Sequence, residues 1–202
     1  MDTGVQTGLT NSPQQPAERR AIRLVLVGLG ADGAAPPGGL PPLESVAAAL
    51  AHQLVAVASA QVRALPGHLP PRTALAALLA PEPSDGSSWL APLLVDVGLP
   101  LPEGGTWAEA LGAWRQPTLL VIAGPQLSCG LAAAGTALLR QWRVPLLGLL
   151  QWGGAWDPGA RRADGLPWLG WLPAEAHSTE AELAALGVIE ALTLAWRRLE
   201  AG

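Results

Sequence analysis

The sequence contains no lysine, no phenylalanine and no tyrosine among its 202 residues. All twelve positive side chains are therefore arginines, which excludes any catalytic or phosphate-binding lysine. The single cysteine, Cys129, excludes an internal disulfide and a multi-cysteine zinc site, and we expect it to be a small buried residue. The three histidines lie far apart and show no metal-ligand spacing: His52, His68 and His177.

Long runs of positive charge and of apolar residues are also absent. The formal net charge is −4 and no basic run exceeds two residues, so nucleic acid and an anionic membrane are poor partners. No apolar run reaches the roughly 18 residues that a membrane span needs. The first twenty residues lack a basic start followed by an apolar segment, so no secretory signal is apparent. We therefore expect a cytoplasmic protein.

What the sequence does contain is apolar side chains in quantity. Half of the residues are hydrophobic and only 14% are charged, which is the balance of a packed domain rather than a disordered chain. Residues 1–20, rich in Gln, Thr, Pro and Gly, read as a flexible tail. We expect residues 21–202 to form a single domain.

Apolar runs of strand length alternate with segments of helical periodicity. This alternation predicts an α/β fold of three layers, with a mostly parallel sheet flanked by helices. Ligands of such sheets bind beyond the carboxyl ends of the strands, where this sequence places Gly28 and Gly30, Gly98, and Gly124. The expected strands are Arg23–Gly28, Leu54–Ala58, Leu93–Gly98, Thr118–Gly124, Pro145–Gln151 and the short extended piece Pro167–Pro173. The expected helices are Leu43–Leu54, Arg72–Leu79, Trp107–Trp114 after a Thr106 cap, Gly130–Trp142, and a last helix from Thr179.

The stretch LVLVGLGADGAAPPGGLPPLESV places a strand, a Gly/Pro-rich loop and a helix in the order of a phosphate-binding P-loop. Such a loop would bring Gly28, Gly30, Glu44 and Ser45 to a nucleotide. Where a P-loop ends in Gly-Lys-Ser/Thr, however, this chain reads Leu-Glu-Ser, so that Glu44 reverses the lysine's charge. A carboxylate about 4 Å from a phosphate oxygen repels it by about 1 kcal/mol in water and by several-fold more in a dry site. The prolines of the loop also have no N–H to donate.

Three passages in register resemble the ATP-dependent dethiobiotin synthetases: LLVDVGLPLP, TLLVIAGPQLSCGLAAAGTALLRQWRVPLLGLLQW and GLPWLGWLP. The resemblance implies a P-loop NTPase-like fold, a homodimer, and ATP with Mg²⁺ as cofactors if the family activity is retained. It implies catalytic and metal-binding roles for Asp96 and a metal-binding hydroxyl on Ser45. Gln151 stands near the position of the family asparagine that reads adenine.

The chain departs from this family wherever a positive charge should face the phosphates. The family lysine after the second strand has no counterpart in Val55–Gln61, and no arginine lies between Arg23 and Arg63. Asp96 could equally cap the following turn, and Ser45 could be an ordinary helix serine. One interpretation is a dethiobiotin-synthetase-like protein that has lost ATP-dependent catalysis and acts through protein contacts. The alternatives are a divergent synthetase that uses arginine and backbone amides, and an unrelated small-molecule-binding α/β domain.

Tryptophan occurs nine times and takes the place of the missing aromatics. Most of these side chains should fill core volume that phenylalanine and tyrosine fill elsewhere. The segment QWGGAWDPGARR, residues 151–162, is different because a loop does not need two tryptophans for packing. Since tryptophan is enriched at binding hot spots, this segment is a candidate contact surface for a protein partner.

Overall fold

The described part of the chain forms an α/β domain around one sheet. The computed structural model describes residues 21–30, 38–55, 60–80, 87–175 and 179–201, so the expected tail at 1–20 lies outside it. The described strands form a six-stranded, all-parallel sheet in the order β2-β3-β1-β4-β5-β6. The expected fold class is confirmed. The strands are β1 (Arg23–Val27), β2 (Ala60–Val62), β3 (Ser88–Pro92), β4 (Thr118–Ala123), β5 (Leu146–Trp152) and β6 (Trp168–Leu172).

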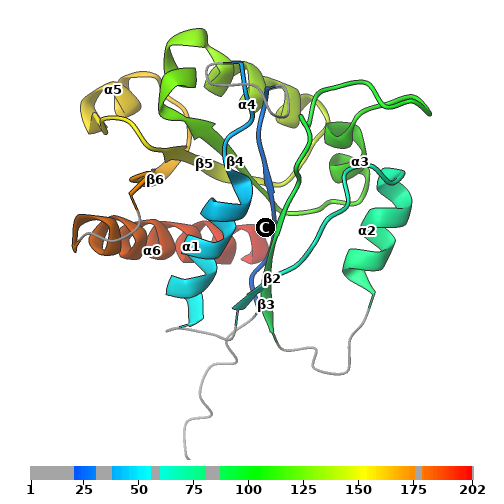
Figure 1. Cartoon of the computed structure of the whole chain (residues 1–202), viewed down its shortest axis with the longest axis horizontal. Helices are drawn as coiled ribbons and strands as arrows, with labels where there is room; N and C mark the ends of the chain where they lie inside the picture. The colour runs from blue at the N-terminus through cyan, green and yellow to red at the C-terminus, as the bar shows by residue number, and fades with distance from the viewer. Residues whose placement is uncertain (1–20, 31–37, 56–59, 81–86, 176–178, 202) are drawn as a thin grey trace, which may run out of the picture.

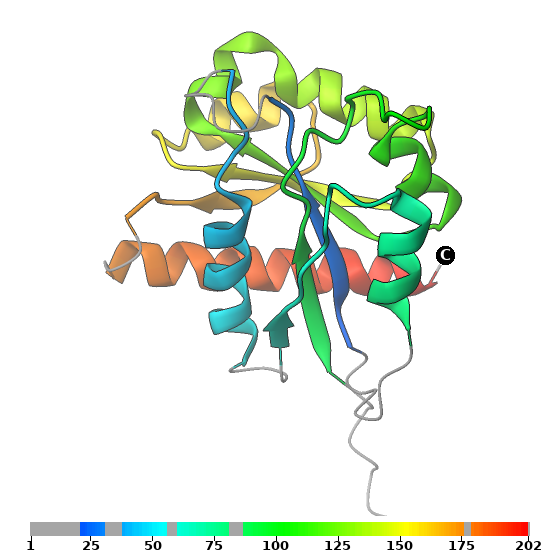
Figure 2. The same cartoon turned by 45° about the vertical axis from the view of Figure 1, so that its right-hand side comes forward.

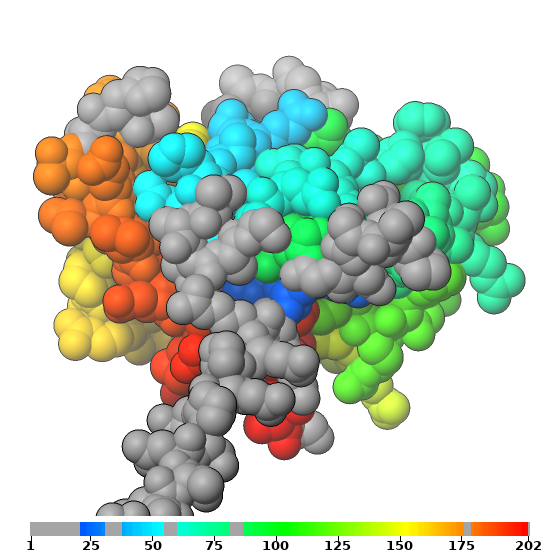
Figure 3. Space-filling model, turned by 90° about the horizontal axis from the view of Figure 1, so that it is seen from below, coloured from blue at the N-terminus to red at the C-terminus, as the bar shows by residue number. Residues whose placement is uncertain are grey.

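Helices cover both faces of this sheet (Figures 1 and 2). They are α1 (Leu43–Val55), α2 (Pro71–Leu79), α3 (Trp107–Ala113), α4 (Leu131–Gln141), α5 (Pro158–Ala163), α6 (Thr179–Ala201) and the 3-10 turn η1 (Gly124–Cys129). Alternate residues of a strand point to opposite faces: Leu24 and Leu26 of β1 join the core under α1 and α6, whereas Val25 and Val27 join the core under α2, α3 and α4. Figure 3, the view from below, shows the start of α6 at the left margin in orange and its C-terminal part in red below the centre.

The strand order places a topological switch point beside β1. From β1 the chain passes through α1 to β2 on one side, and from β4 it passes through α4 to β5 on the other. Neighbouring strands whose connections diverge in this way leave a crevice at their carboxyl ends, where α/β proteins bind ligands. The ends of β1 and β4 are therefore the first place to look for a site.

Most expected elements are confirmed within a residue or two, but two strands are displaced. The strand expected at Leu93–Gly98 lies earlier in the chain, as β3 at Ser88–Pro92. Its position is set by β1, which pairs in register with Trp89 to Pro92. The strand expected at Leu54–Ala58 is also wrong at its start, since α1 continues through Val55, and β2 begins only at Ala60. Residues 56–59 lie outside the described residues.

Two further expectations are corrected around β4 and β5. The segment 151–162 is not one loop, because it contains the last residues of β5 and most of the short helix α5. Asp157 caps α5 by accepting hydrogen bonds from the backbone N–H groups of Gly159 (2.8 Å) and Ala160 (3.0 Å). Cys129, expected to be buried, is exposed at the end of η1, because the turn carries it away from the sheet.

Candidate functional site

Asp96 is fixed beside the carboxyl end of β1 by backbone pairing that continues past β3. Leu93 N–H donates to the Leu26 carbonyl (2.9 Å) and Val97 N–H to the Gly28 carbonyl (3.2 Å). One carboxylate oxygen of Asp96 accepts from Gly30 N–H and the other from Gly98 N–H, each at 2.6 Å. Both oxygens are thus engaged by backbone donors. The glycine that should face a phosphate donates its N–H to the protein's own carboxylate.

The chain also folds back over the two glycines that follow β1. A Cβ on Gly28 would lie 2.7 Å from Cδ of Pro41, and one on Gly30 would lie 2.6 Å from the carbonyl oxygen of Gly39. Gly30 also has φ of +127°, which L side chains rarely adopt. The glycines are therefore required for close packing of residues 38–41 onto the strand end.

Gln126, in the turn after β4, fills the crevice between the ends of β1 and β4. Its side chain is fully buried. Its Oε1 accepts from Ala123 N–H (2.9 Å), and its Nε2 donates to the carbonyls of Leu29 (2.9 Å) and Gly39 (2.7 Å). The side chain thus joins β4, the end of β1 and the returning segment. Our sequence reasoning missed this residue, although a polar side chain just after the clearest strand was an available signal.

Glu44 and Ser45 stand apart from this buried polar set. Both lie in the first turn of α1 and are exposed, while Val46, Ala47 and Leu50 form the packing face of the helix. At the start of the helix, Leu43 N–H donates to the Pro41 carbonyl (2.8 Å). Among the described residues, no three His, Cys, Asp or Glu side chains gather where they could hold a metal ion.

Gln151 lies near the carboxyl end of β5, and its side chain is buried beneath the following turn. Its Nε2 donates to the carbonyls of Gly153 (2.9 Å) and Ala155 (3.0 Å). Its Oε1 is buried and has no hydrogen-bond partner among the described residues. The turns after β4 and β5 touch here, since a Cβ on Gly124 would lie 2.9 Å from the Gly153 carbonyl oxygen. Gln151 therefore lies beneath the backbone of the turn after β5, and its amide nitrogen already donates to two carbonyls of that turn.

A hollow of about 500 Å³ lies beside α5. The rings of Trp156 and Trp168 meet edge to face with centroids 6.2 Å apart, and the Arg161 guanidinium lies 5.1 Å from the Trp168 centroid. Asp164 orders this wall, because it accepts from the Trp168 indole N–H and pairs with Arg161 at 3.4 Å. The rest of the lining comprises Pro158, Arg162, Gly165 and Leu166.

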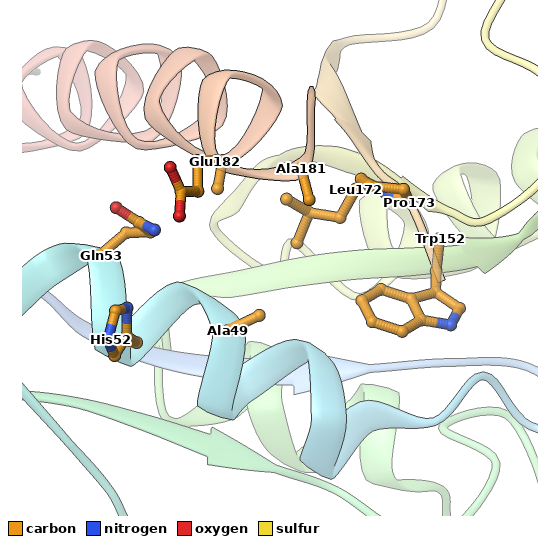
Figure 4. Close-up of a pocket in the computed structure, with 9 residues that line it drawn as sticks. Ala49, His52, Gln53, Trp152, Leu172, Pro173, Ala181 and Glu182 are labelled. Carbon is orange, nitrogen blue, oxygen red and sulfur yellow. The ribbon is translucent and has the colours of Figure 1, made fainter. Parts of the chain in front are cut away.

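A second, narrower groove of about 260 Å³ runs between α1 and α6 (Figure 4). Its floor is mostly apolar, with Trp152 at one end. Gln53 and Glu182 point toward one another across it, and His52 lies on the α1 side. The groove lies on the face of the sheet that α1 and α6 cover, and its lining does not include Asp96 or Gln126.

In comparisons with known proteins, the chain matches no protein-family model and no curated protein. Within the described residues, no helix is both long enough and apolar enough to cross a membrane.

Proposed function

We propose that this chain is a dethiobiotin-synthetase-like protein of the P-loop fold that has lost ATP-dependent catalysis and acts through protein contacts. One observation carries the proposal: the Gly30 N–H, at the strand end where a phosphate would be held, is bound by the Asp96 carboxylate. In the family that the sequence resembles, an acidic residue at this place holds the metal ion. In this chain, both carboxylate oxygens of Asp96 accept hydrogen bonds from backbone N–H groups.

The described residues of this edge fit the phosphates of ATP poorly. A phosphate brought to the Gly30 amide would meet the Asp96 carboxylate already there, and two such anions 4 Å apart repel by about 4 kcal/mol near a protein surface. The crevice that could widen to admit the phosphate is filled by Gln126 and by Pro41. The exposed Glu44 adds negative charge at the start of α1. We therefore expect neither ATP nor Mg²⁺ as a resident cofactor.

The hollow beside α5, lined by Trp156, Trp168 and Arg161, supports the proposal that the chain acts through protein contacts. Trp156, Trp168 and Arg161 are held against one another and ordered by Asp164, so little side-chain entropy would be lost on binding. Tryptophan and arginine in a preformed hollow are the side chains that most often carry interface affinity. This surface lies within and beside the segment 151–162, which the sequence indicated for a protein partner.

Growth rescue tests the loss of catalysis. A biotin-requiring strain that lacks its own dethiobiotin synthetase is supplied with this chain, and an active synthetase serves as the positive control. We expect no growth without biotin, even though circular dichroism of the purified chain shows a folded α/β protein. Growth at the rate of the positive control would overturn the proposal and establish the divergent, ATP-dependent synthetase in its place.

A further inference from the structure

The hollow beside α5 lies at an outer margin of the sheet. β6, which begins at Trp168, is the last strand in the sheet order, and Figure 1 shows α5 next to it. The indole rings of Trp156 and Trp168 stand at 76° to one another, so they form a corner with two aromatic walls. Pro158 and Leu166 add apolar surface to the lining. Both tryptophans are half-buried, which leaves part of each ring open to a ligand.

The polar side chains that line this hollow are all hydrogen-bond donors. They are two indoles and two guanidiniums, and neither kind of group accepts a hydrogen bond. The Pro158 carbonyl already accepts from Arg162 Nε (3.0 Å). The Leu166 carbonyl already accepts from the Trp168 backbone N–H (2.8 Å). A ligand that fits must therefore present acceptors and few N–H groups, because a buried N–H without a partner costs about 1–3 kcal/mol.

Several of these donors have no partner among the described residues. Arg161 Nε is buried and unpaired there, although a terminal nitrogen of the same guanidinium lies 3.4 Å from the Asp164 carboxylate. The Trp156 indole N–H donates to no described residue. The exposed Arg162 forms no ion pair within the described part of the chain, and Asp157 is occupied by the backbone of α5. Arg162 is therefore available to an anionic group of a ligand.

We infer that the partner presents a proline-rich segment with an acidic residue beside its prolines, an inference that rests on the proposed action through protein contacts. Proline supplies a carbonyl acceptor and no N–H, and its rigid apolar ring packs against the indole faces of Trp156 and Trp168. Such segments adopt the polyproline II conformation before they bind, so they lose little backbone entropy in an aromatic-lined groove. The acidic side chain forms charge-assisted hydrogen bonds with Arg162.

Other ligands match only part of this lining. A helical segment uses its carbonyls within its own backbone, so it leaves the donors of the hollow unpaired. An extended segment without proline brings one N–H per residue to a lining whose side chains accept none. A small inorganic anion pairs with Arg162 but leaves the apolar corner uncovered. The proline-rich segment matches the rings, the donors and the charge together.

Isothermal titration calorimetry of the full chain with synthetic peptides tests the inference. The probe is an end-blocked peptide of eight prolines followed by two glutamates, and it should bind with a dissociation constant on the order of 100 μM. One matched peptide replaces every proline by alanine, and it should bind at least about tenfold more weakly. The other replaces both glutamates by lysine, and it should also bind about tenfold more weakly.

Variants of the chain connect this binding to the hollow. Trp156→Ala should raise the dissociation constant of the probe at least about tenfold. Trp114→Ala is the matched control, because Trp114 is 37% exposed at the end of α3 and lies outside the lining. Arg162→Glu, at an exposed position that leaves the fold intact, should weaken binding of the glutamate peptide about tenfold and strengthen binding of the lysine peptide. Circular dichroism of each variant checks its fold.

The outcomes separate the partner class from the proposed function. The inference is overturned by the absence of saturable heat up to about 1 mM probe, or by an affinity that Trp156→Ala leaves unchanged. Equal affinity for the glutamate and lysine peptides contradicts the acidic residue. Equal affinity for the proline and alanine peptides, lost in Trp156→Ala, overturns the preference for proline while the hollow remains a contact surface. None of these results bears on catalysis, which growth rescue tests separately.

Discussion

At the scale of single residues, the side chains of Gln126 and Asp96 form hydrogen bonds with backbone groups of the chain, at a place where a ligand would be expected. Gln126 satisfies one amide and two carbonyls that no neighbouring strand reaches. Asp96 satisfies two amides of turns that would otherwise be open. Because the crevice between β1 and β4 is where a ligand is expected, these two residues decide what the edge of the sheet can bind.

Replacement of Gln126 by leucine should destabilise the protein by about 2–4 kcal/mol. The change leaves Ala123 N–H and the carbonyls of Leu29 and Gly39 without their partner in a buried place, and buried unsatisfied groups cost about 1–3 kcal/mol each. Urea denaturation of the variant measures the loss. The exposed Gln141, at the end of α4, provides the control: Gln141→Leu should change the free energy of unfolding by less than about 0.5 kcal/mol. Equal stability of the two variants would contradict this role for Gln126.

Residue roles were only partly readable from the sequence. Capping of the turn by Asp96 was one of two open interpretations, and the Gly98 contact agrees with it. The bond to Gly30 could not be foreseen, because it joins residues 66 positions apart. Its position after a strand pointed to Gln126, but its two carbonyl partners could not be foreseen, because they lie 87 and 97 positions away. The exposure of Cys129 depends on the path of η1, which local composition does not determine.

At the scale of elements, α5 should respond to acid through its cap. The backbone N–H groups of Ala160 and Gly159, and then the charges of Arg161 and Arg162, hold the pKa of the Asp157 carboxyl below its usual 3.8. A carboxyl whose pKa is lower when folded stabilises the helix above pH about 4 and loses that contribution as the pH falls through the folded value. We expect the fluorescence of the tryptophans beside α5 to change below pH 4 in the wild type. Asp157→Asn, which keeps the cap but cannot titrate, should remove that step from the profile; an unchanged step would refute the assignment.

Gly187→Ala should stabilise the protomer. Position 187 lies inside α6 with open space around it, so alanine gains helix propensity of about 0.5–1 kcal/mol without a clash. For a domain of this size, the melting temperature should rise by about 2–4 °C. Differential scanning calorimetry of the variant and of the wild type measures the change in melting temperature. A fall in melting temperature would show that residue 187 is packed within the protomer.

Elements with a long periodic or unbroken apolar pattern were predictable from the sequence. Elements whose position depends on pairing with a distant strand were not. The run Thr118–Ala123 is buried along its whole length and was expected as a strand. The position of β3 was mistaken because the run from Trp89 to Val97 is apolar almost throughout, and only pairing with β1 selects its strand portion. β2 has three residues and α5 six. Such short elements carry too little periodicity to be recognised.

At the scale of the whole molecule, alternating strands and helices were enough to predict a parallel sheet covered on both faces. The strand order was not predictable, and it alone identifies the ends of β1 and β4 as the switch point. The absence of lysine already argued against phosphate binding in the sequence. The structure adds a physical cause, since the described groups at that edge bind one another.

Isothermal titration calorimetry of the full chain with ATP and Mg²⁺ tests this account most directly. The Gly30 amide is bound by Asp96, and the crevice holds Gln126. We therefore expect no saturable heat at nucleotide concentrations up to about 1 mM, which corresponds to a binding free energy weaker than about 4 kcal/mol. One-to-one saturation in the micromolar range would contradict the account, because it would require the edge of β1 and β4 to open for a polyphosphate.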